Sequence, residues 1–254
     1  MVRLDRALVD RGLARSRGQA RELITAGLVR VADRPAGKPS VDVDDATPIT
    51  VEAGDHYVSR GAHKLLGALA DLDLQPYGRA VDAGASTGGF TQVLLEAGCE
   101  QVYAIDVGHD QLSRRIRSDP RVVVWERTNL RDLELRHVDQ RPVNLLVADV
   151  SFISLRLLIA PFDRVLRDDA DMLIMIKPQF EVGRADLGKG GVVADPELRR
   201  AAVDGVLRTA AETGWAVVRV APSRVPGGSG NQEFFAHLRR REGLSVPRTY
   251  ASIS

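Results

Sequence analysis

Apolar and polar residues alternate along most of the chain in the manner of strands separated by helices. From residue 79 onward, short apolar runs typical of buried strands are followed by segments in which apolar residues recur every three or four positions. Strands that alternate with helices predict a parallel sheet covered by helices on both faces. The expected strands are 80–83, 102–106, 122–125, 145–149, 173–177, 216–220 and 233–238, and the expected helices are 89–97, 155–166 and 196–213. The last two strands are joined by a loop without a helix, so one of them should run antiparallel.

The first 55 residues follow a different pattern, in which two helices precede short strands. The first helix should end near Gly12, where a left-handed cap is expected. The second should begin at the capping-box pair Ser16 and Gln19 and end near Gly27. Strands are expected at 28–31 and 49–51, with a turn at 33–35. These patterns predict a small α+β domain at 1–55, a linker at 56–60, a large α/β domain at 61–245 and a tail at 246–254.

Composition narrows the function classes only slightly. The 254 residues are 44% hydrophobic and 27% charged, as in an ordinary globular protein. No apolar run approaches the ~20 residues that a membrane-spanning helix needs, and the N-terminus shows no apolar signal core, so we expect no export. Cys99 is the only cysteine, which excludes an internal disulfide framework and a cysteine-based zinc site. We expect a cytoplasmic protein without a membrane partner and without a metal.

Charge is unevenly distributed, although the net charge is only +1. Residues 1–39 carry nine Arg or Lys against four acids, and residues 42–55 carry five acids and no Arg or Lys. A basic head of this kind is typical of a phosphate-binding module and equally of a solvated surface, so charge alone does not decide between them.

The most informative segment is the glycine-rich run from Asp82 to Phe90, which follows an expected strand and opens an expected helix. Such a turn lets a nucleotide-like ligand approach the backbone closely. Its spacing is neither the dinucleotide fingerprint nor a P-loop. An acid two residues before the first glycine fits S-adenosylmethionine, because a carboxylate there can meet the cationic amino group of the methionine moiety. Asp106 closes the next strand, where Rossmann-like folds hold ribose hydroxyls. A tight turn without a ligand is the alternative.

Two charged residues leave apolar strands at the edge of the sheet where ligands are expected. Asp149 and Lys177 end the fourth and fifth expected strands, and ligands of open α/β sheets bind outside the carboxyl ends of the strands. Each residue alone fits strand-end solvation or a salt bridge between the two, but together beside the glycine-rich run they favour catalysis. Glu233 could enter the same edge. Lys64 has the position of a lysine on the polar face of a helix that begins near Ser59.

Five motifs resemble those of the TlyA family of ribosomal RNA methyltransferases. They are LVDRGLARSR at 8–17, VSRGAHKL at 58–65, DAGASTGGF at 82–90, ADVSFIS at 148–154 and KPQFE at 177–181. The last three are long and distinctive, and the similarity extends over almost the whole chain. His-Tyr-Val at 56–58 departs from the Trp-containing linker of some members.

The resemblance implies a small N-terminal S4-like RNA-binding domain and a Rossmann-like class I methyltransferase sheet similar to that of FtsJ. It implies that S-adenosylmethionine is the cofactor, that a methyl group passes to a cytidine 2′-hydroxyl of 16S or 23S ribosomal RNA, and that ribosomal subunits are partners. The implied catalytic residues are Lys64, Asp149, Lys177 and Glu233. The expected cofactor contacts are Asp82, Gly84, Ser86, Thr87, Gly88, Gly89, Phe90, Asp106 and Val107. The expected RNA contacts are Arg3, Arg6, Arg15, Arg17, Arg21 and Arg60.

The roles within this tetrad remain open between two mechanisms. Lys177 would stabilise the ribose hydroxyl as it loses its proton, or act as the base if burial or the charge of Lys64 favours its neutral form. Asp149 would orient Lys177, and Glu233 would position the hydroxyl or pair with Lys64. The rival functions are a non-catalytic RNA-binding scaffold, a membrane-active hemolysin, and a methyltransferase that acts on a base or a small molecule.

Overall fold

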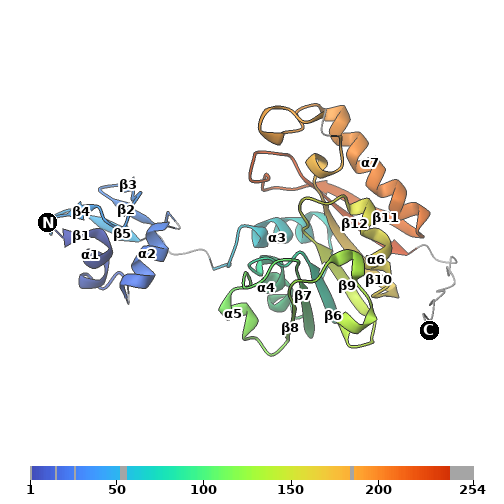
Figure 1. Ribbon diagram of the computed structural model, residues 1–254, viewed down its shortest axis with the longest axis horizontal. Coiled ribbons are helices and arrows are strands. Elements are labelled where there is room, and N and C mark those ends of the chain that lie inside the picture. The colour runs from blue at the N-terminus through green and yellow to red at the C-terminus, as the bar shows by residue number, and fades with distance from the viewer. Residues whose placement is uncertain (1, 15, 26, 52–55, 184–185, 241–254) are drawn as a thin grey trace. The chain divides into compact units, whose positions relative to one another are not determined.

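The computed structural model describes residues 2–14, 16–25, 27–51, 56–183 and 186–240 (Figure 1). The chain divides into two compact units, residues 1–56 and 57–254, called here the N-terminal and C-terminal units. No described helix is both long enough and apolar enough to cross a membrane.

The N-terminal unit packs two helices against short antiparallel strands. Its helices are α1 (Leu4–Asp10) and α2 (Arg17–Thr25). Its strands are β1 (Val2–Arg3), β2 (Val29–Val31), β3 (Arg34–Pro35), β4 (Asp42–Val43) and β5 (Ile49–Val51). β1 pairs with β4, and β3, β2 and β5 form a second small sheet in that order. Leu4, Leu8, Ala20, Ile24 and Val29 are buried between the helices and the strands.

The expected helix boundaries of this unit are confirmed, and its turn is shifted. Gly12 has a φ of +70°, the left-handed conformation expected just after α1. Ser16 Oγ accepts a hydrogen bond from the backbone N–H of Gln19 (3.2 Å) at the start of α2. The turn expected at 33–35 lies at Ala32 and Asp33, which both have positive φ, and the next two residues already form β3. The strands β1 and β4 were not expected, because two-residue strands leave no alternation to detect.

The C-terminal unit is built on a seven-stranded sheet in the order β11-β12-β10-β9-β6-β7-β8. The strands are β6 (Arg79–Ala83), β7 (Gln101–Ile105), β8 (Val122–Trp125), β9 (Val143–Ala148), β10 (Leu166–Ile176), β11 (Trp215–Pro222) and β12 (Phe234–Arg240). All neighbours are parallel except β12, which is antiparallel to both β10 and β11. The prediction of a parallel sheet with one antiparallel terminal strand is confirmed.

Helices cover both faces of this sheet (Figure 1). The helices are α3 (Gly61–Leu72), α4 (Gly89–Glu96), α5 (Arg114–Arg117), α6 (Ile159–Asp163) and α7 (Pro196–Glu212). α3 and α4 pack on one face with Leu145 and Val147, and α6 and α7 pack on the other with Leu146 and Ala148. The central strands β6, β7 and β9 are therefore buried on both faces, which is why they read as continuous apolar runs, whereas β11 at the edge of the sheet is mostly exposed.

Two expected elements of the C-terminal unit need correction. The single helix expected at 155–166 is a short 3-10 helix, Leu155–Leu157, followed by α6. Pro161 explains the break: a continuous helix would place it in the interior, whereas α6 begins two residues earlier and holds it in its first turn. Leu166 already begins β10, seven residues before the strand expected at 173. The polar residues 167–169 and a register shift hid this part of the strand.

Candidate active site

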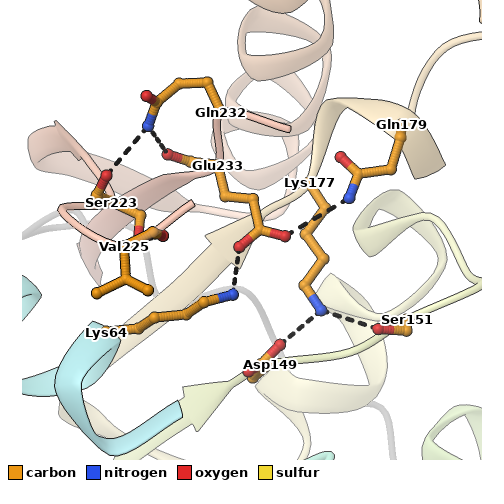
Figure 2. Close-up of polar contacts among 9 residues, drawn as sticks. All are labelled: Lys64, Asp149, Ser151, Lys177, Gln179, Ser223, Val225, Gln232 and Glu233. Atoms are coloured by element: carbon orange, nitrogen blue, oxygen red, sulfur yellow. Dashed lines mark hydrogen bonds and ion pairs between the residues drawn. The ribbon is translucent and has the colours of Figure 1, made fainter. Parts of the chain in front are cut away.

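Four charged side chains from separate segments meet at the carboxyl edge of the sheet (Figure 2). Lys177 Nζ lies 2.6 Å from Asp149 Oδ1, and these residues directly follow the adjacent parallel strands β10 and β9. Lys64 Nζ, on α3, lies 2.5 Å from Glu233 Oε2, just before β12. Because β12 is antiparallel to β10, its first residue lies beside the last residue of β10. The reversed strand is what brings Glu233 to this edge.

The tetrad is largely withdrawn from solvent. The side chains of Lys64 and Lys177 are 12% and 10% exposed, and that of Glu233 is 3% exposed. Lys64 is therefore not a solvated surface lysine. Asp149 and Lys177 form the salt bridge that the sequence allowed as a purely structural role. Because Asp149 also lines a cavity, the pair is placed to act on a bound ligand as well.

Polar neighbours hold the two ion pairs. Ser151 Oγ accepts a hydrogen bond from Lys177 Nζ at 2.8 Å. Gln179 Nε2 donates to Glu233 Oε1 at 3.5 Å, so Gln179 contacts the carboxylate of the second pair (Figure 2). Neither Ser151 nor Gln179 was expected as a site residue. Both lie two residues from an expected one, within the motifs ADVSFIS and KPQFE.

A cavity of about 250 Å³ adjoins the tetrad. Five of the expected cofactor contacts line it, namely Gly84, Ser86, Thr87, Gly89 and Phe90. Lys64 and Asp149 of the tetrad line it too, as do Ser59, Arg60, Gly61 and Ala85, which were not expected as cofactor contacts. Arg60, expected to contact RNA, therefore lies on the wall of this cavity. A signal for Ser59 and Gly61 was present, since both fall inside the motif that carries Lys64.

Close backbone contacts explain two of the glycines in the loop. A Cβ atom on Gly84 would lie 2.5 Å from the backbone oxygen of Asp149, and Gly84 also has a φ of +89°. A Cβ on Gly89 would lie 2.2 Å from Ser59 Oγ and 2.9 Å from the backbone nitrogen of Ala62. Any larger residue would push the loop away from the Asp149 segment or from α3. The glycines thus hold the cavity wall against the tetrad.

Asp82 lies near the end of β6, is fully buried and is not among the residues that line the cavity. Burial raises the pKa of its carboxyl to about 7, and the hydrogen bond from Thr91 Oγ1 (2.6 Å) opposes that shift only in part. Its Oδ1 atom is buried and has no hydrogen-bond partner among the described residues. A buried acceptor of this kind fits a cationic group brought by a ligand.

Asp106 occupies the end of the neighbouring strand. Its Oδ2 accepts from the backbone N–H of Ser86 (2.8 Å), and its Oδ1 accepts from that of Gly108 (2.7 Å). A small hollow beside it is lined also by Gln111 and Glu126, and the adjacent Val107 is 74% exposed. Glu126 directly follows β8 as Asp106 follows β7, so the strand-end reasoning applied to Asp106 would have found it.

The arginines of the N-terminal unit gather around one carboxylate. Arg3, Arg17 and Arg21 lie 3.2, 2.9 and 3.2 Å from the oxygens of the buried Asp5. Burial raises the pKa of Asp5, but hydrogen bonds from the three arginines outweigh it and hold this pKa well below its usual range. Arg6 pairs with Asp10 at 3.5 Å on the exposed side of α1. Arg15 lies outside the described residues.

Comparison with known proteins assigns the chain to a family. Residues 57–240 match the family model for FtsJ-like methyltransferases, and residues 2–47 match that for the S4 domain. The chain is 52% identical to the 16S/23S rRNA (cytidine-2′-O)-methyltransferase TlyA of Mycobacterium tuberculosis, over 94% of this chain and 90% of the relative. This chain belongs to the TlyA family of FtsJ-like methyltransferases. The expected family, the S4-like head and the Rossmann-like methyltransferase fold are thereby confirmed.

Solved structures support the same assignment of this TlyA-family chain. A candidate hemolysin of Streptococcus thermophilus is 36% identical and superposes with a TM-score of 0.74, covering 97% of this chain and 92% of that one. The N-methyltransferase NodS of Bradyrhizobium japonicum is only 16% identical, with a TM-score of 0.51 over 75% of this chain and all of that one. The second likeness concerns the fold alone.

Proposed function

We propose that this TlyA-family chain transfers the methyl group of S-adenosylmethionine to the 2′-hydroxyl of a cytidine in ribosomal RNA. The observation that carries the proposal is the convergence of two lysine–carboxylate pairs on one glycine-walled cavity. The Mycobacterium tuberculosis relative is named for this reaction on 16S and 23S rRNA. Because ribosomal RNA is a cytoplasmic substrate, we place the protein in the cytoplasm. We retain 1–55 and 61–245 as its domains, joined by 56–60 and followed by a tail at 246–254.

The residues around the cavity fit S-adenosylmethionine. The orphaned Oδ1 of Asp82 would accept from the cationic amino group of the methionine moiety. Each Asp106 oxygen already accepts one backbone N–H and keeps a further lone pair for a ribose hydroxyl. When bound, the cofactor supplies a methyl group already activated by a sulfonium. The chain therefore has to align a weak nucleophile and accommodate the charge that develops on it.

The contacts of Lys177 favour its role as a stabilising cation. Its ammonium has three N–H donors, of which Asp149 and Ser151 accept two. The third can face the ribose oxygen as negative charge develops there, in a site largely closed to water. Asp149 holds Lys177, and Glu233 holds Lys64, which lines the cavity and can contact the same hydroxyl.

The N-terminal unit would dock the RNA. Arg3, Arg17 and Arg21 converge on Asp5 while their side chains remain about half exposed, so three cations share one counter-charge on a surface. A local excess of positive charge attracts phosphates. The match to the S4 domain supports this role. Arg6 would add a fourth contact, and Arg60 would meet RNA at the cavity.

The test is methylation of ribosomal subunits that lack the modification. Purified protein is incubated with radiolabelled S-adenosylmethionine and separately with large or small subunits, and labelled ribose is mapped by nuclease digestion. Lys177→Ala runs in parallel, with Arg167→Ala as the control, because Arg167 lies at the other end of β10 from Lys177. We expect label on a cytidine 2′-oxygen that disappears only in Lys177→Ala.

Two other outcomes separate the rival functions. Cofactor binding without label on either subunit would indicate another RNA or a small-molecule substrate. Loss of cofactor binding as well would indicate a non-catalytic RNA-binding scaffold.

A further inference from the structure

The loop between β9 and the 3-10 helix Leu155–Leu157 carries a residue that contacts Lys177, yet little of the loop is buried. Phe152, at its apex, is 91% exposed and has a φ of +64°, a conformation that L-residues other than glycine rarely adopt. A backbone conformation of this kind persists only where the surroundings hold it. The contacts that hold this loop therefore decide where Ser151 lies.

Hydrogen bonds at two places tie this loop to the segment that follows β10, in addition to a contact between the rings of Phe152 and Phe180, whose centroids lie 5.2 Å apart. At the first, Ser151 Oγ accepts from Lys177 Nζ at 2.8 Å. At the second, Glu181 Oε2 accepts from Ser154 Oγ at 2.6 Å, and Glu181 Oε1 accepts from the backbone N–H of Leu155 at 2.7 Å. Ser151 and Ser154 are thus held by Lys177 and Glu181, which lie in one short segment of the motif KPQFE.

Glu181 is a strong anchor for the loop. Its side chain is 1% exposed, and it accepts from Ser154, Leu155 and Arg156. The guanidinium of Arg156 also donates to the backbone oxygen of Glu181 at 2.6 Å. Bonds to a buried carboxylate are charge-assisted and strong, so the loop cannot shift without breaking several of them.

Lys177 needs more than one partner to be held in place. A lysine ammonium is a point charge on a flexible four-carbon stem, so a single contact with Asp149 would let Nζ pivot about the carboxylate. A second acceptor, Ser151, removes this freedom and leaves one N–H without a hydrogen-bond acceptor among the described residues, with the centroid of the Phe180 ring 5.9 Å from Nζ. We propose that Ser151 and Glu181 are positioning residues, with Ser151 fixing the Lys177 ammonium directly and Glu181 fixing the loop that presents Ser151.

This proposal rests on the proposed methyl transfer, so its first test does not depend on activity. The chain contains only four lysines, at 38, 64, 177 and 189. Protein labelled with ¹⁵N at lysine Nζ would therefore give a spectrum of very few ammonium signals, and Lys177→Ala would identify the Lys177 signal. We expect Ser151→Ala and Glu181→Gln to shift or broaden this signal while the Lys64 signal stays in place. An unchanged Lys177 signal in Ser151→Ala would overturn the proposal.

The second test uses the rate of methylation. Ser151→Ala should lower kcat on the order of tenfold, the effect of losing one hydrogen bond to a charged group, with KM for S-adenosylmethionine and for RNA nearly unchanged. Ser151→Thr, which keeps the hydroxyl, should recover most of the rate. Ser118→Ala is the matched control, because its hydroxyl donates to the nearby backbone oxygen of Arg115 on α5, away from the tetrad.

Combining the two variants shows whether Ser151 and Glu181 act through the same loop or independently. If both residues act through the same loop, the loss in Ser151→Ala combined with Glu181→Gln is smaller than the product of the single losses. A fully multiplicative loss, or a Ser151→Ala enzyme with wild-type kcat, would overturn the positioning role. Wild-type protein that binds cofactor but methylates no subunit would contradict the proposed function instead, while the ammonium spectrum would still decide the role of Ser151.

Discussion

Both units of this chain pair basic side chains with buried carboxylates, but in different proportions. In the C-terminal unit each tetrad lysine has its own carboxylate, and both lysines are nearly buried. In the N-terminal unit three arginines share Asp5 and remain about half exposed. Pairs of one lysine with one carboxylate leave little net charge, so their effect on a ligand depends on where their atoms lie. A cluster of three cations around one anion leaves positive charge on the surface, which suits the docking of phosphates.

The largest effect is expected where the balanced pairs are broken. Glu233→Gln leaves Lys64 without its carboxylate in a site where both are largely buried. We expect methylation to fall on the order of 10²- to 10⁴-fold, and the free energy of unfolding to fall by roughly 3 kcal/mol. Methylation assays and calorimetry measure the two losses.

A matched double variant separates catalysis from stability. Lys64→Met combined with Glu233→Gln removes the stranded charge and should restore most of the unfolding free energy without restoring methylation. Recovery of both would show that the Lys64–Glu233 pair serves the fold alone.

Asp82 differs from the carboxylates of both units, because its buried Oδ1 has no hydrogen-bond partner among the described residues. Its pKa in the folded chain is about 7, above the value of 3.8 expected when unfolded. Between these pH values the folded chain keeps a proton that the unfolded chain releases, so this group lowers stability as pH rises to about 7. Asp82→Asn should therefore raise the unfolding free energy at pH 8.5 by roughly 2–4 kcal/mol and change it little near pH 4.

The same substitution should weaken cofactor binding, since the ionised carboxylate is the proposed partner of the cationic amino group. Chemical denaturation at the two pH values and calorimetric titration with S-adenosylmethionine measure the two effects. Equal destabilisation at both pH values, with unchanged affinity, would remove Asp82 from the cofactor site.

A smaller effect is expected at Asp5, where the shared anion is removed. Asp5→Asn should lower the stability of the N-terminal unit by roughly 2 kcal/mol, because a neutral amide with one acceptor oxygen replaces the carboxylate that three arginines share. The low pKa of Asp5 means that this stability is present above about pH 4, the usual value for Asp, and is lost as pH falls further. Hydrogen exchange of residues 2–51 in the full chain measures it. Asp10→Asn, which alters the exposed Arg6 pair, is the control and should have little effect.

The smallest effect is expected at the arginines themselves. Arg6→Ala should weaken RNA binding and reduce the slope of log affinity against log salt by about 1. It should leave S-adenosylmethionine affinity and the stability of the N-terminal unit unchanged. Arg17→Ala should weaken RNA binding similarly and also loosen the Asp5 cluster. Equal loss of RNA and cofactor affinity in Arg6→Ala would contradict the division of labour between the units.

Reasoning from the sequence succeeded where function follows from local chain geometry. Asp149 and Lys177 end consecutive apolar strands, and parallel neighbours bring their ends together, so this contact was predictable. The glycine-rich loop was predictable for the same reason. Lys64 and Glu233 are separated by 169 positions, and only the family resemblance brought them together in advance. Ser59 and Glu181 were missed because neither ends a strand.

The sequence by itself determined the two units, the alternation of strands and helices, and the chemistry at the strand ends, because hydrophobic periodicity and glycine placement act over short stretches of chain. Tertiary structure alone decided the charge pairs that do not follow from the ends of neighbouring parallel strands. The antiparallel insertion of β12 between β10 and β11 placed Glu233 beside Lys64. The folding of α1 against α2 placed Arg17 and Arg21 around Asp5. Electrostatic partners depend on distances across the fold and on burial, and neither is encoded in the spacing of residues along the chain.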